Sequence, residues 1–76
     1  EFKAINLSTL EDLASRNNLT EVTLETLVQA GFVSANDKVK ILGNGAITRA
    51  LAVKANAFSK SAEAAIVAAG GSIEKL

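Results

Sequence analysis

Hydrophobic and polar residues alternate in three short segments of this chain, at residues 2–7, 38–42 and 51–55. Successive side chains of an extended backbone point to opposite sides, so this period of two predicts three β-strands. The first segment carries Asn6 among its apolar positions, which favours a place at the edge of a sheet. A further short strand is predicted at residues 72–76, after a pair of glycines.

In the second and third strands, apolar and basic side chains take opposite faces. The face expected to lie toward the core carries four apolar residues: Val39, Ile41, Leu51 and Val53. The other face carries three basic residues: Lys38, Lys40 and Lys54. We therefore expect the basic side chains to share the outer surface.

Apolar residues recur three and four positions apart in three other segments, which predicts helices. The first helix begins at Ser8, whose hydroxyl can cap the free backbone amides while Glu11 reaches back toward the cap. The turn-forming residues 16–18 end it. Its buried stripe is expected to consist of Leu10, Leu13 and Ala14.

The second helix has a clear signal at each end. Thr23 is its expected cap, and Gly31 ends it, because glycine adopts the left-handed conformation without strain. Phe32 can then fold back onto Leu27, as in a Schellman-type helix end.

The third helix is rich in alanine and is predicted to span residues 62–69. Ser59 or Ser61 caps it, and the pair Gly70-Gly71 ends it. A narrow stripe of small and apolar residues lets it lie close on a sheet: Ala62, Ala65, Ile66 and Ala69.

These elements predict an α/β fold, a single small domain over residues 1–76 with irregular strand–strand–helix units, a mixed sheet and about three helices. Of the residues, 49% are apolar but many are alanine, so the core should supply only on the order of 3–5 kcal/mol. The chain begins inside a strand pattern without Met, which indicates a piece of a longer protein.

Composition narrows the chemistry further. The absence of Cys and His removes disulfides, zinc–thiolate sites and imidazole bases, so no His can take a proton from a Ser or Thr hydroxyl, and the sequence establishes no Ser–Lys arrangement. No apolar run approaches the ~20 residues of a membrane-spanning helix. We expect an intracellular, soluble, non-enzymatic protein with no metal, no cofactor and no small-molecule substrate.

The loop Gly43-Asn44-Gly45 is a candidate phosphate cradle, because glycine-rich loops can present backbone amides to an anion. A P-loop requires Lys and then Ser or Thr directly after its second glycine, whereas Ala46 and Ile47 follow here. A tight turn explains the three residues without a bound mononucleotide.

Charge is distributed unevenly along the chain, although the net charge is zero. Residues 1–37 hold two basic and six acidic residues, a net charge of −4, and the remainder therefore carries +4. Between residues 38 and 62 there is no acid and there are five basic residues: Lys38, Lys40, Arg49, Lys54 and Lys60. Such a stretch favours an anionic partner, and nucleic acid above all, over a merely solvated surface.

The same region carries a family resemblance. Its apolar, Gly, Ser and Ala positions closely resemble the C-terminal signature of bacterial-type large-subunit ribosomal protein fifteen. The matching segments are Lys40–Gly45, Leu51–Ala55, Phe58–Ala62, Ile66 and Ala69–Gly71. Residues 4–7 and 22–27 also look like that family.

The resemblance implies the C-terminal globular domain of a structural constituent of the large ribosomal subunit. It further implies binding to large-subunit ribosomal RNA of the 23S type, neighbouring ribosomal proteins as partners, no membrane, and a place in cytoplasmic or organellar ribosomes. The basic N-terminal extension of family members is absent from these 76 residues. The candidate RNA contacts are Lys38, Lys40, Asn44, Arg49, Lys54, Ser59 and Lys60.

Two alternatives remain at this point. The first is a protein-interaction module, in which the acidic half, residues 11–37, docks a basic neighbour and the basic side chains are only solvated. The second is a small enzyme, for which the sequence nominates no catalytic side chain.

Overall fold

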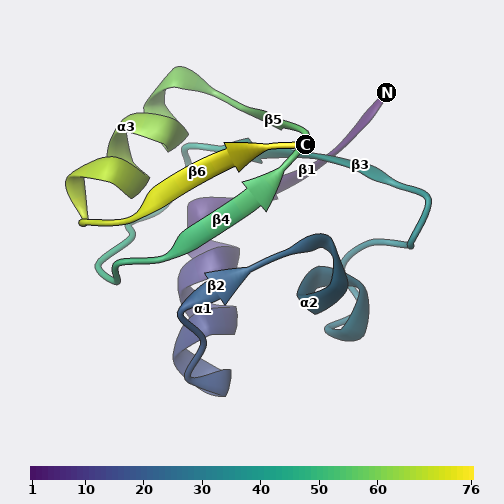
Figure 1. The fold of residues 1–76 in the computed structure, drawn as a ribbon, viewed down its shortest axis with the longest axis horizontal. Coiled ribbons are helices and arrows are strands. Elements are labelled where there is room, and N and C mark those ends of the chain that lie inside the picture. Colours follow the sequence, from purple (N-terminus) through teal and green to yellow (C-terminus); the bar gives the residue numbers. More distant parts are fainter.

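The structure, a computed structural model, describes all 76 residues and contains three helices and six strands (Figure 1). The helices are α1 (Leu7–Asn17), α2 (Leu24–Gln29) and α3 (Lys60–Ala68). The strands are β1 (Phe2–Asn6), β2 (Glu21–Val22), β3 (Lys38–Leu42), β4 (Ala52–Ala55), β5 (Ala57–Phe58) and β6 (Ser72–Lys75). The predicted small α/β domain with three helices is confirmed.

The strands form two parallel sheets of three strands each, instead of one mixed sheet. One sheet has the order β1-β3-β5 and the other the order β2-β4-β6, so consecutive strands alternate between the sheets. Figure 1 shows β4 and β6 side by side, although 16 residues separate them in sequence. The prediction that the first strand lies at a sheet edge is confirmed, because β1 pairs only with β3.

The strands β2 and β5 were not predicted from the sequence. Each has two residues, which is too short to show an alternating pattern. They nevertheless complete the sheets, because β2 pairs with β4 and β5 pairs with β3.

A single hydrophobic core lies between these elements. All fifteen buried residues are hydrophobic, and no polar or charged residue is buried with them. The predicted inward residues of β3, β4 and the residue before β4 are confirmed as buried: Val39, Ile41, Leu51 and Val53. The helices contribute the predicted positions Leu10, Leu13, Ala14, Ala62 and Ile66. Each fully buried aliphatic side chain of this kind stabilises the fold by about 1.5–3 kcal/mol relative to exposure.

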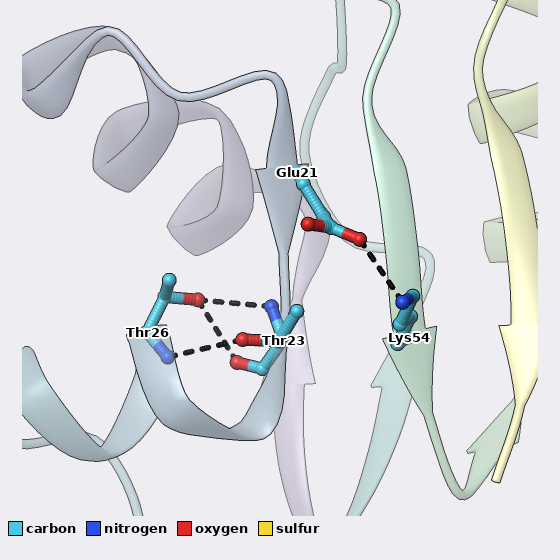
Figure 2. Close-up of polar contacts among 4 residues, drawn as sticks. All are labelled: Glu21, Thr23, Thr26 and Lys54. Carbon is cyan, nitrogen blue, oxygen red and sulfur yellow. Dashed lines mark hydrogen bonds and ion pairs between the residues drawn. The ribbon is translucent and has the colours of Figure 1, made fainter.

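The ends of α2 follow the sequence prediction. The Thr23 hydroxyl accepts a hydrogen bond from the Thr26 N–H at 3.3 Å, and the Thr26 hydroxyl accepts one from the Thr23 N–H at 2.9 Å (Figure 2). At the other end Gly31 has φ +84°, and the Phe32 N–H donates to the Leu27 carbonyl at 3.0 Å. This is the Schellman arrangement, and it satisfies carbonyls that the helix leaves free.

The serine cap and the glycine end predicted for α3 are confirmed, although the helix spans Lys60–Ala68 and so begins two residues before the predicted start. Of the two candidate caps, Ser59 takes the position, and its hydroxyl accepts a hydrogen bond from the Ala62 N–H at 3.2 Å. The Gly71 N–H donates to the Ile66 carbonyl at 2.9 Å after Gly70 with φ +90°.

The start of α1 differs from the prediction. The helix begins at Leu7, its cap position is Asn6, and no side chain caps it, so the predicted capping box at Ser8 and Glu11 is wrong. The physical reason is tertiary, since the Ser8 N–H donates to the Asn44 carbonyl at 3.1 Å. The predicted end is confirmed by Asn18, which has a left-handed φ of 54°. Neither α1 nor the other two helices have the length and apolarity needed to cross a membrane.

Candidate nucleic-acid interface

Lys38 and Lys40 lie on the same face of β3, opposite the buried Val39 and Ile41, as the alternation predicts. Lys38 is exposed and pairs in register with Phe2, whereas Lys40 is half-buried in the middle of its sheet. The two ammonium groups therefore extend the basic surface along the strand.

Lys54 lies in the other sheet, on β4, so it does not form a row with the lysines of β3. Its Nζ is 3.1 Å from a carboxylate oxygen of Glu21 on β2 (Figure 2). The hydrogen bond to Glu21, the charge of Glu21 and the charge of Glu74 raise the pKa of Lys54. Its positive charge is thus balanced by acids on both neighbouring strands, which the sequence could not indicate because β2 was not predicted.

Three further candidate residues, Asn44, Ser59 and Lys60, lie at one edge of the β1-β3-β5 sheet. Because these strands are parallel, their carboxyl ends meet at the same edge, where ligands of open α/β sheets also bind. There α1 follows β1 directly, α3 follows β5, and the loop of residues 43–50 follows β3. Asn44 follows β3 at this edge, and Ser59 and Lys60 follow β5, whereas Arg49 lies at the far end of the loop, beside Glu11 of α1.

The glycines of this loop allow it to lie directly against the two helices. A Cβ on Gly43 would overlap the Ser61 Oγ of α3. A Cβ on Gly45, which has φ +95°, would stand 2.6 Å from the Cβ of Ser8 of α1. Another residue at Gly45 would push the loop away from α1, and one at Gly43 would at least force the Ser61 side chain to move. The loop is therefore held between the first turns of α1 and α3.

Ser59 and Asn44 both have roles within the fold. The Ser59 hydroxyl caps α3 and lies 3.3 Å from the Ser61 hydroxyl, while the Asn44 carbonyl accepts the bond from Ser8. The Asn44 side chain remains exposed. Surface hollows lie elsewhere, one of about 190 Å³ between α1 and α2 and another beside Asp37, and none of the seven candidate residues lines them.

Glu11 of α1 contacts the 43–50 loop, although the sequence predicted a role for it in capping the helix. Its carboxylate accepts hydrogen bonds from the Thr48 N–H at 3.0 Å and from the Thr48 hydroxyl. The Thr48 hydroxyl above all, and then the Thr48 N–H, lower the pKa of Glu11, with smaller contributions from Arg49. Glu11 and Thr48 are 37 positions apart in the sequence, and no local pattern signals a contact over that distance.

Comparison with known proteins gives the family of this chain. The model of a family described as ribosomal proteins 50S-L15, 50S-L18e and 60S-L27A matches residues 4–74. The chain belongs to this family. The predicted resemblance is thus confirmed, and the family segments include the loop and the helix starts described above.

Relatives named as the large ribosomal subunit protein uL15 match all or nearly all of the chain. It is 59% identical over 76 residues to the large ribosomal subunit protein uL15 of Bacteroides thetaiotaomicron, and 58% identical to that of Porphyromonas gingivalis. The uL15 protein of Azobacteroides pseudotrichonymphae is 47% identical over 73 residues, or 96% of the chain. The chain spans about half the length of these relatives, 51%, 51% and 48% respectively.

Proposed function

We propose that this chain is a structural constituent of the large ribosomal subunit and binds large-subunit ribosomal RNA through the carboxyl edge of the β1-β3-β5 sheet. Membership of the family is the observation that carries the proposal. The geometry supports it, because the loop that carries Asn44 and Arg49 lies against the start of α3, which carries Lys60, and the sequence has no acid between residues 38 and 62. Neighbouring ribosomal proteins are its other proposed partners, and the cytoplasmic ribosome is its proposed location.

The proposed contacts are to phosphate, with no reading of bases. Phosphate binding gains free energy from counterion release and requires positive charge presented together. Base recognition in single strands uses exposed aromatic rings, whereas Phe58, the aromatic residue nearest this edge, is half-buried against the core. The contacts therefore position the domain on the RNA.

The seven candidate residues differ in how much of their charge or hydroxyl is available to bind a phosphate. Lys60, which is exposed, and Arg49, which is half-buried beside Glu11, form the centre of the proposed surface, with Asn44 as a neutral donor. Lys38 and Lys40 extend it along β3. Ser59 acts chiefly by holding the start of α3, and Lys54 contributes least, because Glu21 and Glu74 balance its charge.

The alternative of docking through the acidic half has less support. Four of its five acids already have partners within the chain: Glu11 bonds Thr48, Asp12 pairs with Arg16, Glu21 pairs with Lys54, and Asp37 accepts a hydrogen bond from the Ser34 N–H. Fewer carboxylates are thus left to meet a basic protein.

A salt series on the full-length protein tests the proposed RNA contact. The double variant Arg49→Glu/Lys60→Glu should bind a large-subunit ribosomal RNA transcript at least tenfold more weakly. Its affinity should also depend less steeply on salt, by about 0.7–0.9 in the logarithmic slope for each phosphate that the variant no longer neutralises. The matched control, Lys3→Glu/Lys75→Glu, makes the same change in net charge at two exposed lysines outside the candidate set and should have a much smaller effect. Equal reductions in affinity in the two double variants would contradict the assignment.

A further inference from the structure

We propose that Glu11 is a positioning residue that holds the 43–50 loop in its RNA-binding geometry, so that this acid raises the affinity of the protein for RNA. The inference rests on the proposed function and names a residue that the acid-free stretch of 38–62 does not include. Glu11 lies beside a surface proposed to bind RNA, and its negative charge by itself would lower the affinity for phosphate.

The direction of the Glu11 side chain follows from helix geometry. Side chains of an α-helix lean toward its N-terminus, so the Glu11 carboxylate lies over the first turn of α1. The loop passes this turn, where the Ser8 N–H donates to the Asn44 carbonyl. Glu11 then meets the loop a second time at Thr48, with both carboxylate oxygens engaged.

Glu11 supplies the only hydrogen bonds that tie residues 45–50 to the rest of the chain. Apart from these bonds, the segment is held by packing contacts, with Gly45 against Ser8 and Ile47 half-buried against the core. Arg49 directly follows Thr48, so the two bonds from Thr48 fix the backbone that carries the guanidinium. Without Glu11, Arg49 would sample several positions, and ordering it on a phosphate would cost additional conformational entropy.

Positioning and charge predict changes of opposite sign. Removal of a carboxylate near a phosphate should strengthen RNA binding if Glu11 acts only as a charge. If Glu11 positions the loop, its removal should weaken binding. The two effects can be separated with Glu63 as a control. This glutamate lies in the first turn of α3, is exposed and makes no hydrogen bond to the loop.

The experiment measures affinity of full-length variants for a large-subunit ribosomal RNA transcript between about 50 and about 200 mM salt. Glu11→Ala should weaken binding by on the order of three- to tenfold and reduce the salt slope by up to about 0.7–0.9, the share of one phosphate. Glu63→Ala, the matched control, should leave affinity unchanged or raise it. Alanine favours the helix, so neither change disturbs α1 or α3 by itself.

A second arm shows whether Glu11 acts through Arg49. In an Arg49→Gln background, Glu11→Ala should weaken binding little further, because the side chain that it positions is already gone. General destabilisation would instead lower affinity by the same factor in both backgrounds and leave the salt slope unchanged. Thr48→Val removes one of the two bonds without touching α1, so it should weaken binding less, in the same direction, and keeps the test open if Glu11→Ala folds poorly.

The outcomes separate this inference from the proposed function. If the wild-type protein shows no salt-dependent RNA binding, the proposed function falls and this inference with it. If the wild-type protein binds but Glu11→Ala and Thr48→Val bind as tightly or more tightly, the proposed function stands and the positioning role is overturned.

Discussion

At the scale of single residues, the space around a glycine decides whether another residue can replace it. Gly31 and Gly45 both have positive φ, at +84° and +95°, but their surroundings differ. A Cβ on Gly31 would meet nothing within 4 Å, whereas on Gly45 it would meet Ser8 at 2.6 Å. The two glycines therefore separate the cost of backbone conformation from the cost of a steric clash.

Gly31→Ala should lower the free energy of unfolding by about 1 kcal/mol, because only the left-handed conformation is strained. Gly45→Ala should cost about 2–3 kcal/mol, because the loop must also move away from α1. Urea denaturation followed by circular dichroism would measure both values. Equal costs would show that the contact with Ser8 does not constrain the loop.

The contact between Glu11 and Thr48 also makes stability depend on pH. The hydrogen bonds from Thr48 lower the pKa of Glu11 in the folded protein, and Arg49 is the charged group beside it. A lowered folded pKa means that this stabilisation is fully present above about pH 4.5, the ordinary value, and is lost as the pH falls through the folded pKa.

Glu11→Gln should consequently be less stable than the wild-type protein at pH 6, and the difference should shrink as the pH falls below about 4.5. Thermal unfolding of both proteins across this range would measure the difference. A gap between them that is independent of pH would contradict the role of the ionised carboxylate.

At the scale of elements, the sequence was informative where a segment is long enough to show a period. The helices and the strands β1, β3, β4 and β6 could be predicted, since their apolar residues repeat and their ends carry capping or glycine signals. The strands β2 and β5 could not, because they have two residues each. The contacts of Glu11 with Thr48 and of Lys54 with Glu21 depend on tertiary placement, so the candidate site was only partly predictable.

Ser59 affects the stability of the whole helix α3, because its hydroxyl caps the first turn. Ser59→Ala should reduce stability by about 1 kcal/mol because the cap is removed. Ser59→Asp restores a good cap but adds a negative charge beside Lys60. We therefore expect Ser59→Asp to recover the unfolding free energy in urea while binding RNA more weakly than wild type. Recovery of both properties would place the start of α3 outside the interface.

At the scale of the whole molecule, the two sheets cannot be separated along the chain. Consecutive strands belong alternately to one sheet and to the other, and both sheets share one core. Neither sheet is therefore an independent unit, despite the division of hydrogen bonds into two ladders.

Unfolding should accordingly be a single cooperative transition. Ile41→Val in one sheet should cost about 1 kcal/mol, and Val53→Ala in the other about 2 kcal/mol, because both side chains are fully buried. Both changes should lower the same denaturation midpoint without altering the slope of the transition. Two resolved transitions in either variant would show that the sheets unfold separately.

The alternation of strands between sheets also has a consequence for synthesis. The first sheet is incomplete until β5 has been made, and the second until β6 has been made, at residues 72–75 of this chain. Because non-local pairs must wait for both partners, folding of a nascent chain should come late and in one step. A chain arrested before Ser72 would present the unpaired edge of β4 to its surroundings, and should be held by chaperones or digested readily by proteases.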